Sequence, residues 1–142
     1  MVGVLIVSHG GLAEALISEV QSLIGQLQKV KGVSIWPREN EKEVRDRIRE
    51  KMAEVDEGDG ILILTDILGG TPTNLSLSFL KEKRVEVVTG VNVPMLLILS
   101  SYQKGKSLEE ICWLVKKSGR RSIILFKEVF GVKRKAEANQ IR

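Results

Sequence analysis

Histidine and cysteine are nearly absent from this chain of 142 residues, which contains one of each, His9 and Cys112. A single cysteine cannot form an internal disulfide and is typical of proteins from a reducing compartment. One histidine and one cysteine also leave too few of the usual ligands for a dedicated zinc site. We therefore predict no metal site.

Long hydrophobic runs are lacking as well. No apolar stretch approaches the roughly 20 residues that a membrane-spanning helix requires. The first residues do not show the charged, apolar and small-residue regions of a signal peptide. We therefore expect a cytoplasmic protein.

Aromatic residues are scarce at 4%, and the net charge of +4 is mild. Part of this charge comes from the basic run at 133–135. Because few aromatic residues accompany the basic ones, and no nucleic-acid module is recognisable, we predict no nucleic-acid partner. A solvated face or an acidic protein partner explains the charge more simply.

Two phosphate-binding motifs are also missing. The chain has no Gly-x-Gly-x-x-Gly after its first apolar run and no Gly-x-x-x-x-Gly-Lys-Ser/Thr. These are the sequences with which dinucleotides and nucleoside triphosphates are usually bound. We therefore predict no cofactor.

The chain does contain an alternation of strand-like and helix-like segments. Continuous apolar runs at 2–7 and 61–64 predict strands that are buried on both faces, as in a parallel sheet. Further strands are predicted at 33–36, 84–89 and 122–126. Helical spacing of apolar residues predicts helices near 12–25, 40–55, 71–81, 94–102 and 107–119.

Two helix starts are marked by residue type. Thr71 followed by Pro72 predicts a hydroxyl N-cap with proline at the first helical position. Ser107 and Glu110 have the spacing of a capping box.

The alternation predicts an α/β fold, a three-layer sandwich with a mainly parallel four-stranded sheet and right-handed crossovers. No linker, repeat or low-complexity segment divides the chain. We predict a single domain over 1–130 and a polar basic tail over 131–142.

The chemistry of the chain is concentrated where its predicted strands end. His9 closes the first strand and precedes Gly10 and Gly11, while Asp66 follows the third strand. In a parallel sheet these ends lie at one edge, so the two side chains are expected to approach one another. A carboxylate that accepts the Nδ1 proton would leave Nε2 as the nucleophile and stabilise the imidazolium.

Helices that begin directly after His9 and at Thr71 favour an anion beside the imidazole, because their first N–H groups are unpaired. A nucleophilic histidine, an orienting carboxylate and two such helix starts suit phosphoryl transfer through a phosphohistidine. The candidate site residues are His9 and Asp66 for catalysis and, for phosphate binding, Gly10, Gly11, Gly69, Gly70 and Thr71.

Each feature also has a purely structural interpretation. His9 could simply close a strand, Asp66 could form an Asx-turn, and Gly69-Gly70 could be a tight turn.

Two other types of His-Gly site fit less well. The phosphoglycerate-mutase type needs an arginine before the histidine and a second histidine, whereas Ser8 precedes His9 here. Tetrapyrrole metal chelatases usually need another histidine as well.

Taken together, the motifs resemble the IIA component of the mannose family of the bacterial phosphoenolpyruvate-dependent sugar phosphotransferase system. The matching sequences occur in the family's order and spacing. They are Val-Ser-His-Gly at 7–10, Pro-x-Glu-Asn at 37–40, Asp66, Gly-Gly-Thr-Pro-x-Asn at 69–74 and Gly-Val-Asn-Val-Pro-Met-Leu at 90–96.

The resemblance implies that His9 accepts a phosphoryl group from the phosphocarrier HPr and passes it to a IIB component, in indirect association with membrane IIC and IID components. It implies that Asp66 orients His9 and that the loop at 69–72 helps to cradle the phosphate. It also implies a homodimer in which the last strand, 122–126, pairs antiparallel with the partner's sheet.

The chain departs from the family's pattern at Arg38, where family members commonly have glycine, and at Gly11 and Leu68, where some relatives have a bulky aromatic. Arg38 could alter partner contacts or add a phosphate ligand. Because no IIB domain follows in the sequence, we expect the IIB partner to be a separate protein or absent. Two alternatives remain, a regulatory phosphoprotein without a transport role and the phosphotransfer subunit of dihydroxyacetone kinase.

Overall fold

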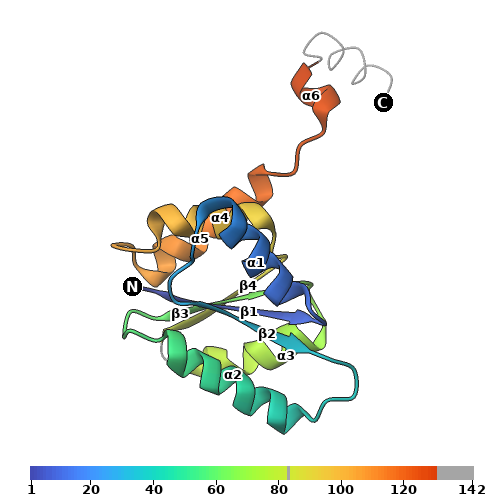
Figure 1. Cartoon of the computed structure of the whole chain (residues 1–142), viewed down its shortest axis with the longest axis vertical. Coiled ribbons are helices and arrows are strands. Elements are labelled where there is room, and N and C mark those ends of the chain that lie inside the picture. Colours follow the sequence, from blue (N-terminus) through green and yellow to red (C-terminus); the bar gives the residue numbers. More distant parts are fainter. Residues whose placement is uncertain (83, 131–142) are drawn as a thin grey trace.

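The computed structural model describes residues 1–82 and 84–130 and shows a sheet covered by helices on both faces (Figure 1). All strand pairs in the sheet are parallel, in the order β2-β1-β3-β4. The strands are β1 (Gly3–His9), β2 (Val30–Ile35), β3 (Ile61–Thr65) and β4 (Val85–Thr89). This confirms the predicted α/β fold and its four-stranded parallel sheet.

The helices form the two outer layers of the sandwich. Figure 1 shows α1, α4 and α5 over one face of the sheet and α2 and α3 over the other. The elements are α1 (Leu12–Ile24), α2 (Glu41–Val55), α3 (Thr71–Leu77), the 3-10 turn η1 (Ser78–Lys81), α4 (Val93–Tyr102), α5 (Leu108–Arg121) and α6 (Phe126–Phe130).

The two central strands explain the continuous apolar runs of the sequence. Alternate side chains of β1 point to opposite faces, so Val4 and Ile6 pack with α1, α4 and α5, whereas Leu5 and Val7 pack with α2 and α3. Every residue of β3 is likewise buried. Because both faces of these strands are buried, their residues do not alternate between apolar and polar. The sheet lies between two apolar cores.

The register of the sheet brings its functional strand ends together. Val7 of β1 lies opposite Thr65 of β3, and His9 lies opposite Ile35 of β2. Since all pairs are parallel, the loops that follow β1, β2 and β3 leave the sheet at the same edge. His9, predicted to close the first strand, is its last residue.

The helix starts agree with the predictions at one site and differ at the other. The Ser107 hydroxyl accepts a hydrogen bond from the backbone N–H of Glu110 and caps α5. Thr71 is not the cap of α3. It is already helical, and the N-cap is Gly70, which is extended and has no side chain to offer.

The predicted strand at 122–126 is not present in this single chain. Ser122 ends α5, residues 123–125 have no regular structure, and α6 begins at Phe126. Backbone hydrogen bonds of a strand need a neighbouring strand, and the segment leaves the body of the molecule (Figure 1). The predicted tail at 131–142 lies outside the described residues.

Within residues 1–82 and 84–130, no helix combines the length and the apolar character needed for crossing a bilayer.

Candidate functional site

His9 and Asp66, from neighbouring strands, are in direct contact. Nδ1 of His9 lies 2.8 Å from Oδ2 of Asp66. The His9 side chain is 48% exposed, whereas that of Asp66 is only 8% exposed. A half-exposed imidazole therefore rests on an almost buried carboxylate, with its remaining nitrogen, Nε2, not used in this contact.

Asp66 accepts hydrogen bonds at both carboxylate oxygens. Oδ2 accepts from the backbone N–H of His9 at 2.8 Å, and Oδ1 accepts from the backbone N–H of Ile67 at 2.9 Å. Burial by itself would raise the pKa of Asp66, but the hydrogen bonds from His9 and Ile67 outweigh it and hold the pKa below its usual range. Asp66 thus braces its own loop, as a turn residue would, and also contacts the imidazole.

The ionisation of Asp66 determines which histidine nitrogen carries the proton. An ionised carboxylate can only accept hydrogen bonds, so the short contact requires a proton on Nδ1 of His9. In a neutral imidazole the lone pair is then on Nε2. The site therefore presents a nucleophilic nitrogen toward the outside of the sheet edge.

Two adjacent glycines shape the loop beneath the imidazole for different reasons. A Cβ at Gly70 would lie 2.5 Å from Cε1 and 3.1 Å from Nε2 of His9, although the φ of Gly70, −87°, suits any residue. Gly69 has φ of +87° and open space around it. Gly70 is required by close approach to the ring, and Gly69 by the backbone turn.

Buried hydroxyls hold this loop in place. The side chains of Thr65 and Thr73 are 2.7 Å apart at their Oγ1 atoms, and the Thr73 hydroxyl donates to the carbonyl of Ile67. Both threonines are almost fully buried. Thr73 stands at the unspecified position of the motif at 69–74, and nothing in the sequence indicates a partner eight residues earlier, so sequence reasoning missed this brace.

The turn after His9 is fixed from within β1. Gly10 has φ of +53°, and the buried Ser8 hydroxyl accepts a hydrogen bond from the backbone N–H of Ala13 at 2.8 Å. Ser8 thereby satisfies one of the N–H groups that a helix start leaves unpaired. Gly11 is the N-cap of α1, so the positive end of this helix lies beside His9.

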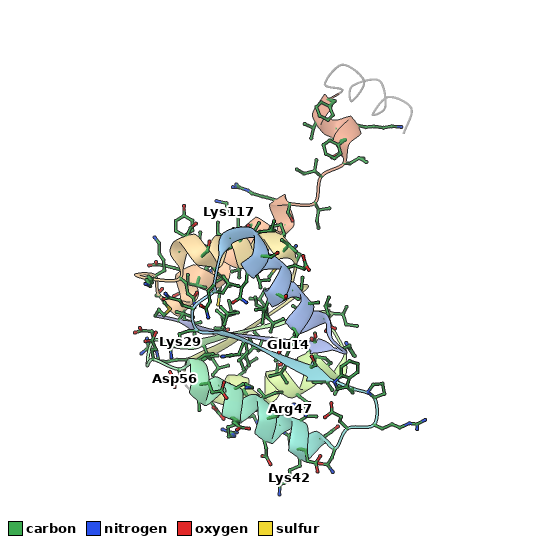
Figure 2. All side chains as sticks on the ribbon, in the orientation of Figure 1. Glu14, Lys29, Lys42, Arg47, Asp56 and Lys117 are labelled. Carbon is green, nitrogen blue, oxygen red and sulfur yellow. The ribbon has the colours of Figure 1, made fainter. Side chains whose placement is uncertain are left out.

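The loop after β2 is held by an ion pair that sequence reasoning missed. Glu39 accepts the backbone N–H of Trp36 at 2.8 Å and pairs with both terminal nitrogens of Arg47, at 2.8 and 3.0 Å. Arg47, labelled in Figure 2, extends from α2 and also donates to the carbonyl of Ser34 at 2.7 Å. The hydrogen bonds from Arg47 and, to a smaller extent, from the backbone of Trp36 hold the pKa of Glu39 below its usual range.

The i, i+4 spacing of Glu43 and Arg47 along a helix gives no indication of the pair with Glu39. Arg47 instead reaches eight residues back to Glu39.

An open cavity of about 630 Å³ is lined by His9 and by residues of these loops. Its lining includes His9, Gly10 and Thr71 from the predicted set, together with Trp36 and Arg38 from the loop after β2. Gly70 lies against the imidazole, while Gly11 and Gly69 shape the two turns without lining the cavity. The predicted residues are thus brought to one place.

Two other observations bear on ligands. A larger open depression of about 1570 Å³, with Met1, Lys29 and Lys104 in its lining, contains none of the predicted site residues. In the described ranges 1–82 and 84–130, no three histidine, cysteine or carboxylate side chains are grouped as metal ligands would be.

Known proteins resemble this chain in sequence and in fold. A family model described as "PTS system fructose IIA component" (EIIA-man) matches residues 3–116. The mannose-specific EIIAB component of Escherichia coli strain K12 is 30% identical over 124 residues, which cover 86% of this chain and 38% of that protein. This chain therefore spans about two fifths of the length of that relative.

Two further relatives match over most of their own length. The fructose-specific EIIA component of Bacillus subtilis strain 168 is 29% identical over 112 residues, which cover 78% of this chain and 77% of that one. The crystal structure of the phosphotransferase system component EIIA from Streptococcus agalactiae superimposes with a TM-score of 0.80 at 25% identity, covering 90% of this chain and 99% of that one.

The close approach of Gly70 to His9 generates a test. We expect Gly70→Ala to displace the imidazole and break its contact with Asp66, because the added Cβ would overlap the ring. In the wild-type chain the contact should protect the Nδ1 proton from exchange and make its NMR signal visible, so the loss of that signal would report the broken contact. Gly69→Ala is the matched control. It should lower the free energy of unfolding by about 1 kcal/mol through backbone strain, yet leave the His9 signal in place. An unchanged signal in Gly70→Ala would contradict the assignment.

The hydrogen bonds to Asp66 also predict a pH effect on stability. Because its folded-state pKa is below the unfolded value of about 3.9, its contribution to stability is present above that value and is lost as the pH falls through the folded-state pKa. We expect Asp66→Asn to lose less unfolding free energy than the wild-type chain between about pH 5 and pH 2, as measured by urea titration. Identical losses in the two proteins would show that Asp66 is not linked to acid unfolding.

Proposed function

Because this chain belongs to the EIIA-man family of the sugar phosphotransferase system, we propose that it carries a phosphoryl group on His9, which it accepts from phospho-HPr and passes to a IIB component. The observation that supports this most directly is the contact between Nδ1 of His9 and Asp66. It leaves Nε2 as the attacking atom. Sugar uptake would follow through membrane IIC and IID components.

The transfer step follows from the protonation state of the pair. Nε2 of His9 attacks phosphorus, a new N–P bond forms, and the bond from phosphorus to the donor breaks with its electron pair going to the donor. The phosphorylated ring keeps its Nδ1 proton and gains positive charge, which the carboxylate of Asp66 stabilises. In the onward transfer a nucleophile of the IIB component attacks the phosphorus and forms a new bond to it, while the N–P bond breaks and its electron pair returns to Nε2.

The backbone around the imidazole suits a phosphoryl group. Gly10 and Gly11 lead into the N-terminus of α1, and Gly69, Gly70 and Thr71 lead into α3. Helix starts and glycine turns present N–H groups without side chains in the way, and these favour an anion. We assign the phosphate cradle to these five residues.

We further propose that residues 1–130 are one phosphocarrier domain and that it works as a homodimer, with segment 122–126 pairing antiparallel with the partner's sheet. The support is the exposure of an apolar run. Ile123 is 83% exposed and Phe126 is 65% exposed. Apolar patches of this kind on a single chain commonly mark a protein interface.

Phosphorylation with purified components tests the carrier role. Incubation of the chain with phosphoenolpyruvate, the general enzyme of the system and HPr should add one acid-labile phosphoryl group, as measured by mass spectrometry. His9→Ala should abolish the addition completely, because this chain has no second histidine. Labelling that persists in His9→Ala would refute the assignment. In the same assay, Asp66→Asn should be labelled about 100-fold more slowly or worse, because the ring loses its charged partner.

Light scattering coupled to size-exclusion chromatography tests the dimer. The full chain should give twice the 15.8 kDa mass of one chain. A chain in which Ile123 and Phe126 are both replaced by aspartate should elute as a monomer, because charges disfavour an apolar interface. The matched control Leu68→Asp, which places a charge at another exposed apolar residue, should remain dimeric. A monomeric wild-type chain would contradict the proposal.

A further inference from the structure

Arg38 has an unusual backbone conformation at the rim of the His9 cavity. Its φ is +69°, in the left-handed region that normally suits glycine. A residue with a Cβ is held there at an energetic cost, and it persists only where the surrounding structure enforces it. The strained backbone at Arg38 therefore points to a use for its side chain.

In the part of the chain that the structure describes, two other residues that are not glycine share this conformation, and both use their side chains within the fold. Nζ of Lys29 donates to the carbonyl of Glu54 at 3.4 Å, and Nη1 of Arg84 donates to the carbonyl of Gly58 at 2.9 Å. For Arg38, residues 1–82 and 84–130 offer its guanidinium neither a hydrogen bond nor an ion pair. Within these described residues no hydrogen bond or ion pair of the side chain offsets the strain, which leaves the guanidinium available to a group from another molecule.

The loop that carries Arg38 is rigidly supported on both sides. Glu39 is tied to the backbone of Trp36 and to the guanidinium of Arg47. Asn40 caps α2 by accepting hydrogen bonds from the backbone N–H groups of Lys42 and Glu43. Figure 1 shows this connection between β2 and α2 extending past the ends of the strands. The Arg38 backbone is thus held in one place beside the site.

Among the described residues that line the cavity, Arg38 is the one permanent cation. The charged residues of its lining other than His9 are Arg38, Glu39 and Glu41. Glu39 is neutralised by Arg47, which leaves Arg38 and Glu41 as the opposing charges. A guanidinium offers a planar fork of donors that matches phosphate oxygens. A partner that docks over His9 brings a phosphoryl group to this opening.

We propose that Arg38 is a recognition residue for the phosphorylated partner, its guanidinium binding the phosphoryl group that the partner carries as it docks over His9. This rests on the proposed carrier function. Arg38 acts on encounter and binding, since charges at a rim mainly set association and its salt dependence. The strained backbone keeps the side chain directed to a partner rather than to the fold.

Rapid-quench kinetics with phospho-HPr measures the effect. We expect Arg38→Gln to raise the phospho-HPr concentration for half-maximal labelling roughly 10-fold and to leave the saturating rate nearly unchanged. Arg38→Lys, which keeps the charge, should restore most of the loss. Lys104→Gln is the matched control, because it removes one positive charge from the depression that does not contain His9. It should behave as the wild-type chain.

Docking is also measured without transfer, in a His9→Ala background, by titration calorimetry. There Arg38→Gln should weaken binding of phospho-HPr about 10-fold and leave binding of unphosphorylated HPr unchanged. Equal weakening of both forms would overturn the proposal, because Arg38 would then contact the partner's surface and not its phosphoryl group. A fall in the saturating rate alone would overturn it as well. Failure of the wild-type chain to be labelled refutes the carrier function separately, since the docking result does not depend on it.

Two further variants separate the side chain from the backbone. Arg38→Gly and Arg38→Ala should lose recognition equally, because both remove the guanidinium. Only Arg38→Gly relieves the left-handed strain, so its melting temperature should exceed that of Arg38→Ala by a few degrees. Equal melting temperatures, or a difference in recognition between the two, would contradict the account of Arg38.

Discussion

The short contact between the imidazole of His9 and the carboxylate of Asp66 is the interaction on which the site depends. Its effect depends on the different solvent exposure of the two groups, because the carboxylate is nearly buried while the imidazole is half exposed. A buried carboxylate that accepts backbone hydrogen bonds stays ionised, and an ionised carboxylate fixes the proton on the inner nitrogen. The outer nitrogen is then the ring nitrogen with a free lone pair, and it belongs to the more exposed group of the pair.

The parallel sheet makes this contact possible. β1 and β3 are neighbours, and their shared direction places His9 and the loop containing Asp66 at the same edge. The two apolar cores hold the strands from both sides, so the positions of their ends follow from packing far from the site. Small residues complete the arrangement, because the imidazole lies where a side chain at Gly70 would have been.

The loop after β2 adds a different kind of constraint. Glu39 and Arg47 stabilise it, and the pair connects the loop to the body of α2. The bonds to Trp36 and Ser34 fix the loop's beginning, while Asn40 fixes its end. The strained Arg38 sits between these supports. Rigid support of this kind is what allows an energetically unfavourable backbone conformation to persist beside a functional site.

The amino-acid sequence by itself determined the four parallel strands, the order of the helices and the residues gathered at the sheet edge, because buried strands and amphipathic helices leave strong periodic patterns. It also drew attention to His9, Asp66 and the glycine loops. It misplaced the cap of α3, where Gly70 takes the position expected of Thr71. It also predicted a strand at 122–126, whose formation needs a neighbouring strand and not only apolar residues.

Only the tertiary structure decided which groups touch. The distance between His9 and Asp66, the space beneath the ring at Gly70 and the pairing of Glu39 with Arg47 join residues that are distant in sequence or on different elements. Local patterns carry no information about such contacts, because strand register and the packing of helices on the sheet set them. The residue types therefore indicate which chemistry the site can perform, and the fold determines the geometry in which it is performed.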